Sequence, residues 1–132
     1  MNIVINPPSL VKPVGYAHAI KTAGGTTIYL AGQVSFDGEG NLINKGDIIS
    51  QFRQAIRNLE IATHEAGAKM TDIVKMTIFT TSKELYKKNL REIGEVYREF
   101  FGKYFPVMTL VEVKSLFEDD ALLEIEGIAV IP

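Results

Sequence analysis

Two glutamates near the end of the chain, Glu124 and Glu126, are the clearest candidates for acid–base chemistry. They are two residues apart in a stretch that alternates as a β-strand does, so both side chains point to one face of a sheet. A carboxylate in a partly dry interface can have a raised pKa and act as a proton donor or acceptor. From the pattern alone, two solvated carboxylates at a sheet edge, or a pairing with a lysine, is the preferred interpretation, and a catalytic carboxylate is the alternative.

A second candidate for chemistry is Gly32, in the sequence Ala31-Gly32-Gln33 that follows an apolar run. Glycine lets a ligand approach the backbone closely, and exposed backbone amides can bind a carboxylate. A β-bulge or a strand end is the preferred explanation of the same glycine, and a ligand site is the alternative. The two histidines, His18 and His64, are isolated and have no third ligand nearby in the sequence, so we expect no metal site.

Composition limits the classes of partner. Fourteen basic and sixteen acidic side chains leave a net charge of −2, and the basic residues between positions 83 and 98 alternate with glutamates. No aromatic residue is placed there for base stacking, so we predict no nucleic-acid partner. The chain has no cysteine, which excludes a disulfide framework and a cysteine nucleophile.

Two amphipathic helices and several strands must position these residues. Apolar residues recur every three or four positions over residues 47–66 and 83–101, and the predicted caps of these helices are Asp47, Ser82, Gly67 and Gly102. Alternation predicts strands over residues 72–81, with Val74, Met76 and Ile78 on one face, and over residues 107–116 and 121–131. Residues 36–41 are rich in turn formers and should be a loop.

The N-terminal part predicts an extended, proline-rich arm followed by two short strands around Gly24-Gly25, which we interpret as a β-hairpin. The element order is then β-β-α-β-α-β-β. We expect an α+β fold in one domain, residues 1–132, with both helices on one face of a mixed sheet. The N-terminus shows no secretory signal and no apolar run spans a bilayer, so we expect a cytoplasmic protein without a membrane partner.

The last strand predicts that the second face of the sheet is apolar but uncovered. Leu123, Ile125, Ala129 and Ile131 point one way, under the helices, and the other side carries Leu122, Glu124, Glu126, Ile128 and Val130. No helix remains to cover this second side, and an exposed apolar surface of this kind is a liability in a monomer. Packing against further copies of the chain in a closed ring is the expected remedy.

Several short motifs together resemble the YjgF/YER057c/UK114 (Rid) family along most of the chain. They are Gly15-Tyr16, Tyr29 to Gln33, Gln54 to Gly67, Asp72 to Lys75, Val96-Tyr97, Phe100-Phe101, Phe105-Pro106, Val111 to Val113 and Glu124 to Ala129. The resemblance implies a chorismate-mutase-like fold and a homotrimer with ligand clefts between subunits. It also implies hydrolysis of reactive 2-imino or 2-enamino acids, such as 2-aminoacrylate, to 2-keto acids and ammonia, without a cofactor or metal.

The resemblance implies roles for particular residues. In deaminating members of the family, an arginine after Phe-Pro-Ala binds the substrate carboxylate, and a glutamate of the final strand positions the hydrolytic water. A tyrosine near the N-terminus and the glycine of the Gly-Gln motif complete the cleft. Tyr16, Gly32 and Glu124 stand at the corresponding positions here.

Two positions depart from that pattern. Met108 stands where the arginine is expected, and Gly94 replaces an asparagine that is often present. Losing a charge-assisted contact to a carboxylate costs about 2–5 kcal/mol, which argues against ordinary 2-imino-acid deamination. The sequence therefore leaves two hypotheses open, an imine hydrolase in which Glu124 activates water and a non-catalytic protein that binds a small metabolite. An RNA-cleaving or translation-inhibiting activity, also linked to the family, is disfavoured by the acidic balance.

Overall fold

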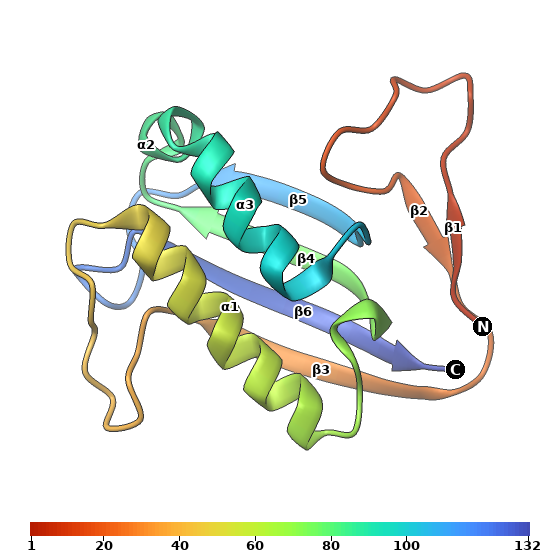
Figure 1. Ribbon diagram of the computed structural model, residues 1–132, viewed down its shortest axis with the longest axis horizontal. Helices are drawn as coiled ribbons and strands as arrows, with labels where there is room; N and C mark the ends of the chain where they lie inside the picture. The colour runs from red at the N-terminus through yellow and green to blue at the C-terminus, as the bar shows by residue number, and fades with distance from the viewer.

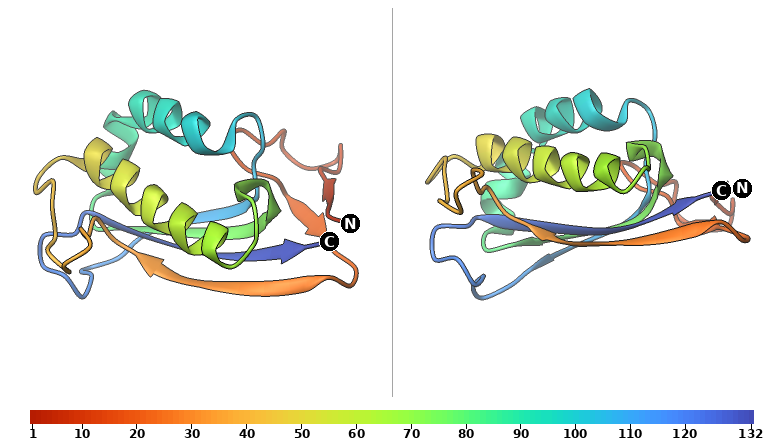
Figure 2. Two further views of the ribbon diagram at one scale, coloured as in Figure 1. Left: turned by 60° about the horizontal axis from the view of Figure 1, so that its bottom comes forward. Right: turned by 90° about the horizontal axis from the view of Figure 1, so that it is seen from below.

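A four-stranded sheet carries all the helices on a single face (Figures 1 and 2). The computed structural model describes residues 1–132. The strands lie in the order β3-β6-β4-β5, and their bounds are Thr26–Gln33 for β3, Leu123–Ile131 for β6, Ile73–Thr80 for β4 and Val107–Glu112 for β5. The β4–β5 pair is parallel and the other pairs are antiparallel, so the predicted mixed sheet is confirmed.

Helix α1, Ile48–Glu65, begins and ends where the sequence predicted. The Asp47 carboxylate accepts a hydrogen bond of 3.1 Å from the Ser50 backbone amide, and bonds from Ser50 hold the pKa of Asp47 below its ordinary value. Gly67 ends the helix with a φ of 86°, a conformation that glycine adopts without strain. One stripe of α1 packs on the sheet through Ile48, Phe52, Ala55, Ile56 and Leu59.

The second predicted helix is in fact two helices. Ser82 caps α2, Lys83–Lys88, as expected, but the helix is interrupted at Asn89 before α3, Leu90–Phe101, begins. Asn89 has a φ of −107° and a ψ of 19°, and its side-chain amide donates to the Leu85 carbonyl at 2.9 Å. An asparagine side chain that bonds the backbone in this way competes with the regular helical ladder. A 3₁₀ turn, Met70–Asp72, connects α1 to β4.

The core lies between the helices and one face of the sheet. Leu123, Ile125 and Ala129 of β6 are fully buried, as the alternation predicted. In β4 the register shifts between Ile73 and Lys75, so Ile73 packs in the core with Met76 and Val74 is only half-buried. The predicted face was therefore right for Met76 and Ile78 but wrong for Val74, because an extra residue in a β-bulge reverses the alternation on one side of it.

The predicted hairpin around Gly24-Gly25 was also wrong. Strand β2, Ala19–Lys21, pairs with β1, Ile3–Ile5, in a separate two-stranded sheet, and β3 pairs with β6 alone. Gly24 and Gly25 both have positive φ, but they carry the chain past the end of β6 and do not bring β2 beside β3. Residues 1–21, called the N-terminal arm below, instead reach β5, where the Ala17 amide donates to the Pro106 carbonyl at 3.0 Å (Figure 1).

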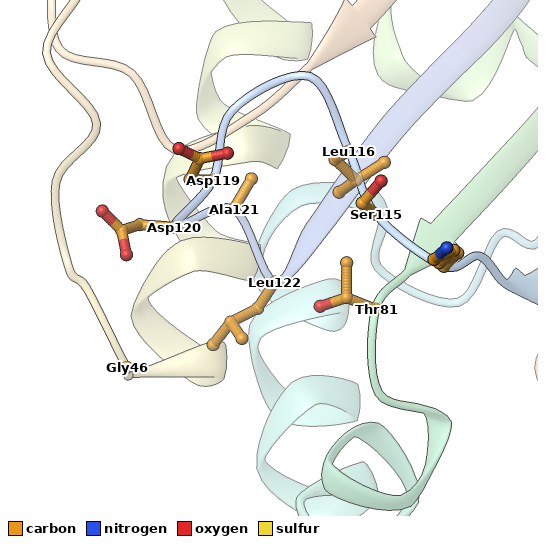
Figure 3. A pocket seen from close by; sticks show the side chains of 9 residues that line it. Gly46, Thr81, Ser115, Leu116, Asp119, Asp120, Ala121 and Leu122 are labelled. Carbon is orange, nitrogen blue, oxygen red and sulfur yellow. The ribbon is translucent and has the colours of Figure 1, made fainter.

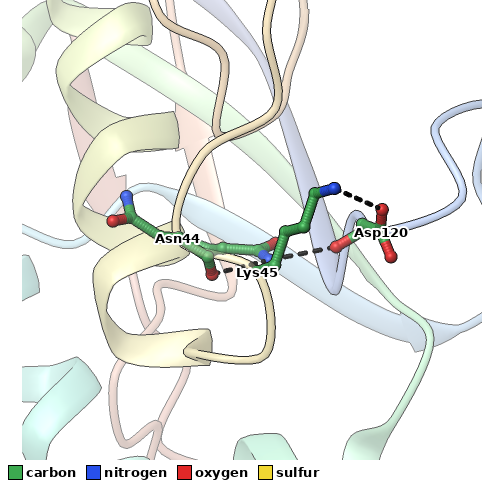
Figure 4. Close-up of polar contacts among 4 residues, drawn as sticks. Asn44, Lys45 and Asp120 are labelled. Atoms are coloured by element: carbon green, nitrogen blue, oxygen red, sulfur yellow. Dashed lines mark hydrogen bonds and ion pairs between the residues drawn. The ribbon is translucent and has the colours of Figure 1, made fainter.

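A buried glutamine fixes the approach to β6. The side-chain amide of Gln51 donates to the carbonyls of Asn44 and Asp120 at 3.1 and 3.0 Å, and its oxygen accepts from the Leu122 amide at 2.8 Å. Lys45 forms an ion pair with Asp120 at 3.4 Å in the same place (Figure 4). These contacts join α1 to the loop that precedes β6, and so they help to position the first residues of that strand.

Replacing Gln51 by leucine is expected to lower the free energy of unfolding by about 2–4 kcal/mol, because three partly buried backbone groups lose their partner. Denaturant titration measures the effect. The matched control is Gln54→Leu on the same helix, which removes only a side-chain bond to Asn58 and should cost less than about 1 kcal/mol. Equal costs in the two variants would contradict the role assigned to Gln51.

Candidate functional site

Gly32 and Glu124 meet on neighbouring strands. The pairing of β3 with β6 shifts register between Leu30 and Gln33, so Gly32 lies in a break of the ladder of the kind that a bulge makes, one of the two structural explanations given for it above. A β-carbon placed on Gly32 would lie 2.0 Å from Oε2 of Glu124, well inside contact distance. The carboxylate therefore occupies the space that any other residue at position 32 would fill, and the glycine is required for this arrangement.

Replacing Gly32 by alanine is expected to turn the Glu124 carboxylate away while leaving the fold intact. The group that must move is the end of a flexible side chain, so the free energy of unfolding should change by less than about 1 kcal/mol. A crystal structure of the variant shows the rotated side chain, and thermal unfolding shows the stability. Gly38→Ala is the matched control, since a β-carbon there meets nothing within 4 Å. An unmoved Glu124 would contradict this reading of the contact.

Glu124 faces away from the helices, at one end of an apolar surface. Four residues of this side, Tyr29, Phe79, Val111 and Ile128, are linked by the strand register, and we call them the bare face. The Tyr29 side of it is open, with 79% of that residue exposed. No helix covers this side of the sheet (Figure 2). The predicted uncovered face is thus present.

The residues of β6 on this side of the sheet differ in how deeply they are buried. Val130, expected to be exposed, is buried, and Asn2 of the N-terminal arm donates to its carbonyl at 2.9 Å. Glu124 is half-buried and Glu126 is exposed. Of the two glutamates, Glu124 is therefore the one that combines partial burial with contact to a backbone glycine.

Met108 lies on the opposite face of the sheet from Glu124. It pairs with Met76, whose side chain is fully buried under the helices. Side chains that share a register position on adjacent strands point to the same face, so Met108 also points towards the helices. A single chain therefore does not bring Met108 and Glu124 together.

Tyr16 is also remote from Glu124 within one chain. It lines a hollow of about 280 Å³ with Lys103, Tyr104 and Phe105, and its ring packs edge-on against His18 at 5.2 Å between centroids. The neighbouring Ala17 lies at the level of Val107 on β5, whereas Glu124 pairs with Phe79 on β4. Val107 pairs with Lys75 of β4, which is four residues, or roughly 13 Å, from Phe79 along that strand. Across the sheet, β4 also lies between β5 and β6.

The two histidines lie in different parts of the fold. The Nε2 atom of His18 lies 2.7 Å from the Val11 carbonyl, and His64 is exposed near the end of α1. No three His, Asp or Glu side chains in the chain are grouped closely enough to bind a metal ion.

An apolar pocket lies beneath α3 beside Met108. Its volume is about 280 Å³, and nine of its twelve lining residues are hydrophobic, among them Tyr86, Ile93 and Phe105. Gly94 and Arg98 of α3 form part of its wall. Arg98 was not predicted as a site residue from the sequence, where it stands among basic residues that alternate with glutamates. The signal that could have found it is the glycine four residues earlier, which leaves room for a long side chain on the same face.

A second hollow, of about 340 Å³, lies beside the loop before β6 (Figure 3). Backbone turns around Gly46, Thr81 and Ser115 form it, together with Asp119 and Asp120. Asp120 already pairs with Lys45. The hollow holds no group that combines burial with an unmet polar contact, so we assign it no chemistry.

The fold and the Gly32–Glu124 contact define a class of protein: small α+β chains with helices on one face of a mixed sheet and a carboxylate on the other. A family model described as "Endoribonuclease L-PSP" matches residues 9–131. A RutC family protein of Pyrococcus abyssi is 41% identical, over 89% of this chain and 88% of that protein. A 2-iminobutanoate/2-iminopropanoate deaminase of Dermatophagoides farinae is 34% identical, over 97% of this chain and 95% of that protein.

Solved structures agree with the sequence relatives. The Rid family protein YyfB of Yersinia pestis superimposes with a TM-score of 0.89 at 28% identity, over 98% of each chain. The chain belongs to the L-PSP endoribonuclease family, also known as the YjgF/YER057c/UK114 or Rid family. None of its helices has the length and hydropathy needed to cross a membrane.

Proposed function

We propose that the protein hydrolyses small, reactive imines or enamines to carbonyl compounds and ammonia, in grooves that form where the bare face of one copy meets a neighbouring copy. The observation that carries the proposal is the contact of Glu124 with Gly32 at the end of the bare face. A half-buried carboxylate beside an accessible backbone segment suits a water molecule held for attack on a small electrophile. The relative from Dermatophagoides farinae is named for this kind of reaction.

Glu124 acts as the general base in this mechanism. Its carboxylate takes a proton from water as the oxygen attacks the imine carbon, and the electron pair of the C=N bond moves to nitrogen. Glu124 delivers that proton to nitrogen, which gives a carbinolamine. It then takes the hydroxyl proton and passes it to nitrogen as the C–N bond breaks, leaving a ketone or keto acid and ammonia. Each proton transfer needs the carboxylate within hydrogen-bond reach of the reacting atoms.

The groove needs more than one copy of the chain. Within one subunit Met108 and Tyr16 lie away from Glu124, and only a neighbouring subunit can place them across the same groove. A closed homotrimer is the arrangement we propose, because it buries every bare face without leaving an open end. Tyr16 and the Gly32 backbone then orient the substrate, and Met108 forms an apolar wall.

A hydrolysis assay tests the proposal. Purified protein is added to 2-iminopropanoate or 2-aminoacrylate generated in situ, and formation of pyruvate and ammonia is compared with the buffer blank. We expect a rate above the blank that is lost in Glu124→Gln. A rate equal to the blank for these substrates and for larger imino acids would overturn the proposal.

One observation favours a second candidate, a non-catalytic protein that binds a small metabolite in the same groove. Met108 cannot supply the cation that a carboxylate substrate needs at that position. A binding protein would show ligand-dependent stabilisation in a thermal-shift screen and no turnover. Turnover that depends on Glu124 decides in favour of the hydrolase.

A further inference from the structure

Arg98 is an arginine of α3 without an acidic partner, and two of the three glutamates of this helix bind other arginines. Glu99 pairs with Arg53, and Glu95 pairs with Arg91 at 3.6 Å. No carboxylate lies within 4.0 Å of Arg98. Its guanidinium also donates no hydrogen bond to another residue of the chain. A cation of this kind is free to bind an anion from outside the protein.

The position of Arg98 is set by Gly94, one turn earlier on α3. The Nη1 atom of Arg98 would lie 3.4 Å from a β-carbon placed on Gly94, so the guanidinium folds back over the glycine. Both residues belong to the wall of the apolar pocket that contains Met108. The absence of a side chain at position 94 therefore brings a positive charge to the rim of a pocket whose interior is apolar.

We infer that Arg98 and this pocket, the Arg98–Met108 pocket, form a binding site for a monocarboxylate with an apolar body. The guanidinium offers a planar fork that matches a carboxylate. The apolar body then replaces water beside Met108, Ile93 and Tyr86. The missing arginine at position 108 is thus compensated from α3, and the apolar wall favours branched or aromatic acids over acids as small as pyruvate.

The volume supports that choice of ligand. A pocket of about 280 Å³ is near the lower end of the range for small-molecule sites. It accommodates an acid of the size of 4-methyl-2-oxopentanoate or phenylpyruvate. The inference does not need hydrolysis to occur, but if the proposed function holds, it makes larger apolar 2-imino acids the preferred substrates.

Calorimetric titration with these two acids tests the inference, using pyruvate and the methyl esters as matched ligands. We expect the two large acids to bind, pyruvate to bind more weakly and the neutral esters not to bind. In Arg98→Gln the affinity should fall about 10- to 100-fold. Arg91→Gln on the same helix removes an equal charge outside the pocket and should bind as the parent does.

The outcomes separate this inference from the proposed function. Equal binding by Arg98→Gln and the parent, equal binding of acid and ester, or no binding of any acid would overturn the inference. Binding that needs Arg98 in a protein without imine hydrolysis would overturn only the proposed function. Hydrolysis of 2-iminopropanoate that is unchanged in Arg98→Gln, with no binding of the large acids, would overturn only the Arg98–Met108 pocket.

Discussion

Replacing Glu124 by glutamine is expected to lower kcat/KM for imine hydrolysis by about 100-fold or more. Glutamine preserves the shape and fills the same space beside Gly32, but it cannot take a proton from water, and the loss of a general base typically costs a factor of about 10² to 10⁴. The measurement is the initial rate of keto-acid formation. Thermal unfolding should show a Tm close to that of the parent, because the side chain is only half-buried.

Glu126→Gln is the matched control for this prediction. Glu126 lies on the same face of β6, two residues further along, and is exposed without a Gly32-like neighbour. Its replacement makes the same change of charge and should leave the rate within a factor of about two, since it holds no reacting group. Equal losses in the two variants would show that charge on this face, rather than a positioned base, determines the rate.

Replacing Tyr29 by lysine is expected to dissociate the assembly into single subunits. Tyr29 is 79% exposed in the lone chain and stands opposite Ile128 on β3, the edge strand of the bare face, so we expect a second copy to cover it. A buried, unpaired ammonium in that interface costs several kcal/mol for each copy. Because Tyr29 is exposed in the lone chain, the variant should remain folded. Sedimentation velocity measures the assembly, and circular dichroism measures the fold.

The matched control is Ile61→Lys. Ile61 is also an exposed apolar residue, at 60%, but it belongs to α1 on the helical side of the sheet. We expect this variant to assemble as the parent does. Dissociation by Ile61→Lys, or a Tyr29→Lys variant that assembles normally, would contradict the use of the bare face as the interface. Hydrolysis should be lost along with assembly in Tyr29→Lys, since the groove needs two subunits.

Hydrophobic periodicity predicted the parts of the fold that depend on local pattern. The α1 stripe, the capping residues Asp47 and Ser82 and the one-sided burial of β6 all follow from spacings of three, four or two residues. Periodicity could not predict the β-bulge in β4, because one inserted residue changes which face follows without changing composition. It also could not predict the break at Asn89, where a side-chain hydrogen bond decides the local geometry.

The N-terminal arm shows a different limit of the sequence. Two β-prone runs around Gly24-Gly25 satisfy every local rule for a hairpin, yet β2 pairs with β1 and the arm lies beside β5. Strand pairing is decided by competition between edges that are distant in the sequence, and local turn chemistry does not determine its outcome. Tyr16 was assigned to the site by resemblance, and its distance from Glu124 within one chain could not be inferred from its position in the sequence.

For the site residues too, the sequence predicted some features and only the structure shows others. The sequence predicted that the backbone at Gly32 could be approached closely. The contact with Glu124 itself depends on the register shift between β3 and β6. Arg98 was hidden among basic residues that alternate with glutamates. Only the three-dimensional structure shows that Glu95 pairs with Arg91 and Glu99 with Arg53 of α1, which leaves Arg98 unpaired beside Gly94.

The mass of the unmodified protein in solution tests most directly whether copies of the chain cover the bare face and create the groove beside Glu124. Sedimentation equilibrium at micromolar concentration should give three times the chain mass of 14.6 kDa, which is 43.8 kDa. A single species of 14.6 kDa over the same range would contradict the account, because the groove would then have only one wall.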